Sequence, residues 1–298
     1  MKNKIIYGMT AFLFLVGILI FNYPVISTLY NQLHQGTVMS NYDETLSQMK
    51  QAQLDALREE AEQYNRNLAG GGQEMQDAFS GETEEEDLEY DGVLDMEESG
   101  VMGAVEIPKI NVYLPIYHGT SQDVLNVGVG HLKGSSLPVG GESTHSVLTG
   151  HRGLPTAELF TNLDQIEKGD VFYVHILKET LAYRVYDIET VLPEEVGSIR
   201  IEEGRDMITL VTCTPYGINS HRLLIHALRT EYRQAEANQE KVRKETLWHW
   251  LWQQKTFLAS FLAVVLALLY GVFRLIKKRL CRKRKGERVR KQQRRRKE

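Results

Sequence analysis

Cysteine is scarce in this 298-residue chain, which contains only Cys213 and Cys281. A small secreted domain held by disulfides needs several cysteine pairs, so that class is excluded. A structural zinc site needs closely spaced Cys or His ligands, and no such spacing joins His131, His145 or His151 to Cys213. The sequence therefore predicts no disulfide framework and no metal site.

Two signatures of well-known enzyme classes are also missing. The Gly-x-Ser-x-Gly turn that carries the nucleophile of many serine hydrolases does not occur. Gly128-Val129-Gly130 is not a dinucleotide-binding fingerprint, because the next glycine, Gly134, comes too late and no helix is predicted after it. We therefore predict no cofactor.

Long apolar runs are confined to two places near the ends of the chain. The first, Ile5 to Phe21, has 17 residues, follows Lys2 and Lys4, and reaches the lower limit for a membrane span. A secretory signal peptide has the same charged start, but no small-x-small cleavage site follows here. These features favour an uncleaved transmembrane anchor over residues 5–27.

The second run, Thr256 to Phe273, has 18 residues without charge. At ~1.5 Å rise per residue it would extend about 27 Å, close to the ~30 Å hydrocarbon core of a bilayer. All three tryptophans precede it, at positions typical of an interfacial aromatic belt: Trp248, Trp250 and Trp252. A buried core helix would not explain that belt. We predict a helical stalk over 231–252 and a transmembrane helix over 253–276.

Charge is distributed unevenly. Residues 277–298 hold fourteen Lys or Arg and two Glu, a net +12, so the formal charge of −4 leaves −16 for the rest. Basic residues beside membrane spans mark the cytoplasmic side, which places residues 1–4 and 277–298 in the cytoplasm. Such a block contacts membrane lipids rather than nucleic acid. The chain is therefore predicted to be a two-pass protein of the cell membrane with an extracellular central part, and topology separates Cys213 from Cys281.

The central part divides by composition. A helical region is expected over 28–72, because apolar residues recur every three to five positions across 41–68 before Gly70-Gly71-Gly72. Residues 73–100 are polar and acidic, as in a solvated linker. Short apolar or alternating runs then predict a sandwich or barrel over 101–230. These runs are 104–107, 112–117, 146–149, 171–176, 181–188, 207–212 and 222–228, with short helices expected at 121–127 and 156–163.

Three reactive side chains follow or begin predicted strands. Cys213 ends the run 207–212, and the chain resumes as a strand at Arg222, so antiparallel pairing would bring both to one end. His151 follows the run 146–149. A lone cysteine is more often a buried small apolar residue. Together, however, the three residues fit a cysteine nucleophile activated by histidine, with a cationic donor to an oxyanion.

The motifs around these residues resemble those of class C sortases, the pilin polymerases. Thr209-Leu210-Val211-Thr212-Cys213 is similar to their Cys motif, Leu148-Thr149-Gly150-His151 to their His motif, and Arg222 stands where their Arg does. Further similar segments are 105–110, 117–121, 134–138 and 213–217, together with Tyr64-Asn65. The resemblance covers nearly the whole chain.

The resemblance implies a mainly β fold: an eight-stranded sortase-type β-barrel with short helices, an N-terminal helical extension and two flanking transmembrane helices. It implies a cysteine transpeptidase that cleaves a Leu-Pro-x-Thr-Gly-like sorting signal between Thr and Gly. Cys213 would hold the acyl group as a thioester until a pilin Lys amine displaces it. His151 would move the protons, and Arg222 would hold the oxyanion. The partners would be pilins or surface proteins with C-terminal sorting signals.

Two alternatives belong beside this interpretation. A sortase that anchors surface proteins directly to peptidoglycan would use a peptidoglycan precursor as acceptor instead. A surface protein carrying its own sorting signal would also end in an apolar run and a basic tail. No Leu-Pro-x-Thr-Gly precedes Thr256, however, and this second alternative fails.

Class C sortases carry a lid with an Asp-Pro-aromatic motif over the empty site. At the matching place this chain has Asp77-Ala78-Phe79, without the rigid proline. We expect a lid within 73–100 that is only weakly held, with Phe79 as a plug and Asp77 either paired with Arg222 or touching Cys213. The alternative is an acidic linker that contains Asp77 and Phe79 by chance.

Overall fold

The computed structural model describes residues 2–69, 77–79, 87–96, 100–154, 157–195 and 198–232, together with Gly271 and Arg274. The chain divides into two compact units, Met1–Arg243 and Lys244–Glu298. Most of the predicted stalk, the second apolar run and the basic tail with Cys281 lie outside the described residues. All eight strands of the fold belong to the first unit.

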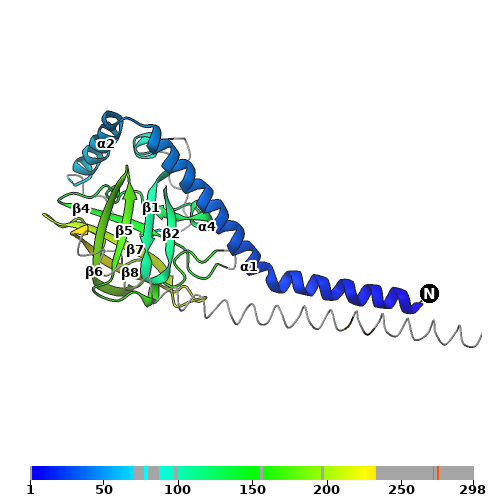
Figure 1. Ribbon diagram of the computed structural model, residues 1–298. Coiled ribbons are helices and arrows are strands. Elements are labelled where there is room, and N and C mark those ends of the chain that lie inside the picture. Colours follow the sequence, from blue (N-terminus) through cyan, green and yellow to red (C-terminus); the bar gives the residue numbers. More distant parts are fainter. Residues whose placement is uncertain are drawn as a thin grey trace, which may run out of the picture. The chain divides into compact units, whose positions relative to one another are not determined.

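Eight strands close into a barrel in the order β1-β2-β3-β4-β7-β8-β6-β5 (Figure 1). Neighbouring strands are antiparallel except for two parallel pairs, β2–β3 and β4–β7. The predicted eight-stranded barrel with short helices is therefore confirmed. The strands are β1 (Val101–Ile107), β2 (Val112–His118), β3 (Val129–His131), β4 (Thr144–Thr149), β5 (Val171–Ile176), β6 (Glu179–Val191), β7 (Asp206–Thr214) and β8 (His221–Thr230).

Alternation along the strands places apolar side chains on both faces of the barrel sheet. Leu148, Leu210 and Ile225 belong to the main core, as expected for side chains that alternate in and out of a closed sheet. The intervening positions contribute to a second cluster on the other face of β4, β7 and β8. Its buried members are Ala78, Leu132, Val147, Ile199, Val211 and Leu224.

The short helices agree only in part with expectation. Helix α4 (Gln122–Val127) forms as predicted, with Ser121 as its N-cap. The helix predicted over 156–163 is wrong, because the described residues there form turns and the 3-10 helix η2 (Leu163–Gln165). Leu159 has a φ of 38°, which no right-handed helix accepts. A second 3-10 helix, η1 (Pro108–Ile110), joins β1 to β2.

The chain begins with two long helices, α1 (Lys2–Gln48) and α2 (Gln51–Ala69). The single helix expected across 41–68 is therefore interrupted at Met49-Lys50. The Tyr42 hydroxyl of α1 donates to the Met102 carbonyl at 2.8 Å. The Asn65 side chain of α2 bonds both the N–H and the C=O of Leu137, at 2.7 and 3.1 Å. These contacts dock the helices onto the barrel.

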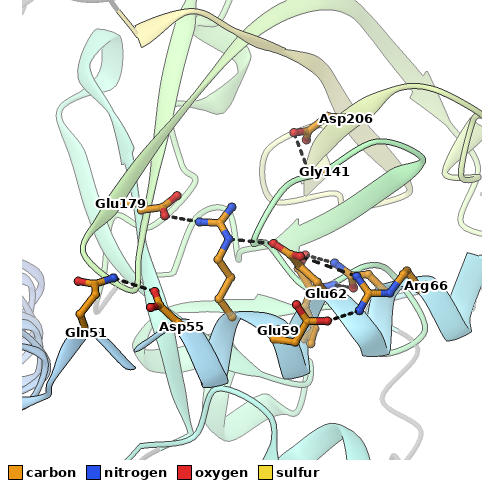
Figure 2. A network of polar contacts seen from close by, with 11 residues as sticks. Gln51, Asp55, Glu59, Glu62, Arg66, Gly141, Glu179 and Asp206 are labelled. Atoms are coloured by element: carbon orange, nitrogen blue, oxygen red, sulfur yellow. Dashed lines mark hydrogen bonds and ion pairs between the residues drawn. The ribbon is translucent and has the colours of Figure 1, made fainter. Parts of the chain in front are cut away.

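Charged side chains form a network along α2 (Figure 2). Arg58 contacts Glu62 at 2.8 Å within the helix and also pairs with Glu179 of β6, while Arg66 contacts Glu59 at 2.6 Å. These side chains are about one-third to two-thirds exposed, and ion pairs at such positions add little to stability. The network therefore orients α2 more than it holds the fold together.

Helix α1 passes without interruption through residues 5–27, the predicted anchor. Its side chains there include several that are more than half exposed, such as Phe12, Leu13 and Ile20. Within the part of the chain that the structure describes, no helix combines the length and the apolar character needed to cross a membrane. The two transmembrane helices therefore remain predictions.

The acidic segment 73–100 is not a uniform linker. Residues 88–92 form α3 (Leu88–Gly92), with Asp87 as its N-cap, and Tyr90 and Leu94 are fully buried. The Tyr90 hydroxyl hydrogen-bonds His131 Nδ1 at 2.8 Å and receives the Gly119 N–H at 3.0 Å. The expectation of a solvated, weakly held segment is thus wrong for residues 87–96, because one buried tyrosine fixes them to the barrel.

Candidate active site

Cys213 and Arg222 face each other across two antiparallel strands. They are directly paired in the register of β7 and β8, and each is 7% exposed. Residues 215–220 connect the two strands at this end of the barrel. The expected juxtaposition of the thiol and the guanidinium is therefore present in the fold.

His151 reaches the same end of the barrel from β4. The parallel register pairs Thr149 with Val211, so two further residues along each strand bring His151 level with Cys213. Two hydrogen bonds hold this extension: Gly150 N–H donates to the Val211 carbonyl at 3.0 Å, and the Thr212 hydroxyl donates to the Gly150 carbonyl at 2.7 Å. A Cβ at position 150 would lie 2.7 Å from the Phe160 ring, so only glycine fits there.

Arg152 is a residue of the site that the sequence did not single out. Its guanidinium donates to the Thr214 hydroxyl and the Thr161 carbonyl, both at 3.1 Å, and pairs with Asp164 at 2.5 Å. It thereby ties the loop after His151 to the loop after Cys213. The sequence signal that could have identified Arg152 is its position next to His151.

Residues 77–79 contact two of the three site residues, Arg222 and His151. The Asp77 carboxylate accepts two hydrogen bonds from Arg222, at 2.8 Å from Nε and 2.6 Å from Nη2. The Phe79 ring centroid lies 5.1 Å from the Arg222 Cζ and 5.5 Å from the centre of the His151 ring. Of the two contacts considered for Asp77, the structure forms the pair with Arg222.

The lid segment also covers the apolar cluster beside the site. Ala78 is buried among Val147, Val211, Leu224 and the other members of the cluster on the outer face of the sheet, and Phe79 packs against the same cluster. Together with the ion pair, this contact means that residues 77–79 occupy both the polar and the apolar part of the site.

Comparison with known proteins identifies the family of this chain. The family model described as the sortase domain matches residues 105–230. The solved structure of Streptococcus pneumoniae sortase C is 46% identical, with a TM-score of 0.62 over 66% of this chain and 97% of that one. The chain belongs to the sortase family.

Sortase C-1 from Actinomyces oris is 51% identical, with a TM-score of 0.57 over 60% of this chain and 99% of that one. Both solved structures are sortases C, in agreement with the class C resemblance. Sortase D of Bacillus subtilis is 34% identical over 38% of this chain and 54% of its own length. The 298-residue chain thus matches about half the length of these curated relatives.

Burial shifts the pKa values of Cys213 and His151 in opposite directions. It raises the pKa of the Cys213 thiol, an effect that Arg222 opposes and Asp77 reinforces. It lowers the pKa of His151. With residues 77–79 in place, the neutral thiol and neutral imidazole are therefore favoured over the thiolate and imidazolium. The hydrogen bonds that Arg222 donates to Asp77 are the main reason that the pKa of Arg222 is raised, so this side chain stays cationic.

Among the residues with a described position, no group of three or more His, Cys, Asp or Glu side chains is placed to hold a metal ion. The three candidate residues supply the thiol of Cys213, the imidazole of His151 and the guanidinium of Arg222. This set can perform nucleophilic acyl transfer with an acid–base partner and a cationic oxyanion donor.

Proposed function

We propose that this sortase is a cysteine transpeptidase that cleaves a Leu-Pro-x-Thr-Gly-like sorting signal between Thr and Gly. The Cys213 thiolate attacks the Thr carbonyl carbon, and Arg222 stabilises the oxyanion. The Thr–Gly C–N bond breaks as His151 protonates the leaving amine, which leaves a thioester on Cys213. An incoming amine then attacks the thioester while His151 takes up its proton, so that a new amide forms and Cys213 is released as the thiolate.

The observation that supports this proposal is the placement of three side chains at one end of the barrel, two on paired strands and His151 just after β4. The cross-strand pair Cys213–Arg222 sets the nucleophile beside a cation. The parallel pairing of β4 with β7 brings His151 to the same level. A rigid sheet can hold such a constellation within the tolerance that catalysis needs.

We propose the Lys side chain of a pilin subunit as the accepting amine, so that the reaction polymerises pilins. Two observations support this choice over direct anchoring to peptidoglycan. The Streptococcus pneumoniae sortase C that it resembles is described in connection with pilin substrate specificity. Residues 77–79 also cover the site in the manner implied by the class C resemblance.

We also propose that the enzyme is held at the cell membrane by two spans, with its barrel outside and both termini inside. The support comes from the sequence: two uncharged apolar runs, the Trp residues before the second run, and fourteen basic residues after it. In this location the enzyme would meet substrates still retained at the membrane.

Incubation with a purified pilin that ends in a sorting signal tests the function. We expect a ladder of covalent multimers on a denaturing gel, absent with the Cys213→Ala protein. Replacing the candidate acceptor lysines in the pilin should remove the ladder but leave the thioester. Efficient transfer to a peptidoglycan precursor without any pilin ladder would favour the anchoring function instead.

A further inference from the structure

The imidazole of His151 has few restraints of its own. The backbone around it is fixed, since Gly150 bonds to β7 and the His151 carbonyl accepts the Phe160 N–H at 3.1 Å. The ring contacts Phe79 on one side, and its Nε2 lies 3.4 Å from Oε1 of Gln122. Among the residues whose positions are described, Gln122 is the only side chain that hydrogen-bonds this ring.

Opening of the lid changes which of these contacts remain. Phe79 belongs to residues 77–79, which must leave before a peptide can reach Cys213 under the proposed function. Its contact with His151 is therefore lost during turnover. Gln122 lies outside the lid segment, so its hydrogen bond is the restraint that the open enzyme keeps.

Helix α4 presents Gln122 from a well-fixed position. Gln122 is its first residue, and the Ser121 hydroxyl caps it by accepting the Val124 N–H at 3.4 Å. At the other end, Gln35 Nε2 of α1 donates to the Val127 carbonyl at 2.8 Å. A Cβ at Gly128 would lie 2.5 Å from the Tyr117 ring, so this end is tightly packed.

The hydrogen bond between Gln122 and His151 determines which ring nitrogen carries the proton. An amide oxygen only accepts, so Oε1 of Gln122 requires a proton on Nε2 of His151. The neutral ring then offers Nδ1 as its basic nitrogen, and the imidazolium keeps the Gln122 bond when Nδ1 is also protonated. We propose that Gln122 is a positioning residue that holds the Nε2–H tautomer of His151, so that His151 exchanges the catalytic proton through Nδ1.

This role rests on the proposed function and extends it to the residue that orients the base. A nucleophile and base commonly depend on a third group that orients the base, and no acidic side chain hydrogen-bonds His151 among the described residues. The elements around the ring carry the charged or titratable groups Cys213, Arg222, Asp77, Asp123 and Arg152. None of these groups offsets the lowering of the pKa of His151 by burial. The group that favours the imidazolium is therefore the amide oxygen of Gln122.

The first test is the pH dependence of kcat/KM for a sorting-signal peptide with full-length Gln122→Leu and Gln122→Glu. If the active form is thiolate with imidazolium, the acid limb follows the pKa of His151, and the plateau rises as the two pKa values approach. Gln122→Leu should move the acid limb to lower pH and reduce the plateau about three- to tenfold, the weight of one hydrogen bond. Gln122→Glu should move the limb to higher pH and keep the plateau at or above the parent value.

Asn126→Leu is the matched control, because Asn126 is an exposed amide on the same short helix. This variant should leave both the limb and the plateau unchanged. An equal loss in Gln122→Leu and Asn126→Leu would mean that only helix α4 was disturbed. That result would overturn the positioning role.

A second readout does not depend on activity. In a Cys213→Ala background, the ¹⁵N chemical shifts of His151 report which nitrogen carries the proton and at what pH the second proton binds. We expect the Nε2–H tautomer in the parent, and a loss of that preference with a lower pKa in Gln122→Leu. A parent Nδ1–H tautomer, or an unchanged titration in Gln122→Leu, would refute the inference. If the parent enzyme cleaves no sorting peptide yet shows these shifts, the proposed function fails and the positioning of His151 stands.

Discussion

Removal of the Asp77 carboxylate should expose Cys213 to reagents in solution. Asp77 and Arg222 share two charge-assisted hydrogen bonds, and their side chains are only 14% and 8% exposed. Lid opening breaks this pair and lets both charged groups regain water. In Asp77→Ala the closed state loses the pair, while the open state loses nothing comparable.

The size of the effect follows from the value of such a contact. Hydrogen bonds to charged groups contribute about 1.5–3 kcal/mol net, and we take about 2 kcal/mol for the pair because both partners rehydrate on opening. At ~1.4 kcal/mol per tenfold, the open population should rise about 30-fold. Phe79→Ala removes a cation–π contact with Arg222 worth about 1 kcal/mol, so roughly a fivefold rise is expected there.

The assay is the rate of Cys213 alkylation by a small thiol reagent, measured across pH in a Cys281→Ala background. The thiolate is the reacting species, so the midpoint of the pH curve gives the pKa of Cys213 and the plateau at high pH gives its accessibility. Asp77→Ala should raise the plateau. It should also lower the midpoint, because Asp77 and burial both raise the pKa of this thiol.

Glu89→Ala is the control, since it removes one negative charge from the same acidic segment at an exposed position. It should leave both the plateau and the midpoint unchanged. A shift of the midpoint alone in Asp77→Ala would mean that the carboxylate acts on the thiol only electrostatically. If neither quantity moves, residues 77–79 do not act as a lid.

Three further predictions concern catalysis and stability. Cys213→Ala should abolish transpeptidation, whereas Cys281→Ala should retain it; product from the former would contradict the mechanism. Arg222→Lys keeps the charge but loses the planar fork, so its kcat/KM should be nearly as low as that of Arg222→Ala, and full activity would reject a geometric role. Burial lowers the pKa of both His131 and His145 from 6.5 to about 4. The unfolded chain therefore takes up these protons first as the pH falls. The free energy of unfolding should keep its full value above about pH 6.5 and decrease towards pH 4, with a loss of up to about 2 kcal/mol per histidine at pH 5. Urea unfolding from pH 7 to 4 measures this slope, which His145→Gln should reduce.

The strands of the barrel were largely predictable because their pattern is local. All seven predicted runs lie within strands, and the pairing of Cys213 with Arg222 follows from two adjacent strands and a short connection. The strand β3, Val129–His131, was missed. It has three residues, and its pairing with both β2 and β4 depends on partners that no local pattern reveals.

The candidate site residues could be named from the sequence, but their arrangement could be predicted only for Cys213 and Arg222. His151 stands level with Cys213 because β4 and β7 run parallel, and parallel neighbours far apart in sequence leave no local signal. Arg152 and Gln122 act through contacts with loops and a ring that come from elsewhere in the chain. The anchoring of residues 87–96 was missed for the same reason: composition marks an acidic segment, whereas Tyr90 binds at His131.

One aromatic ring links access to the site with the chemistry inside it. Phe79 lies against both Arg222 and His151, so closing the lid covers the cation and buries the base in one movement. With ordinary pKa values of ~8.5 for Cys and ~6.5 for His, about 1% of molecules near pH 7.5 hold thiolate and imidazolium together. With residues 77–79 in place, burial raises the pKa of Cys213, an effect that Asp77 reinforces, and lowers that of His151. We therefore expect lid opening to increase the reactive ion pair as well as admit substrate, and the two effects of Asp77→Ala on alkylation to appear together.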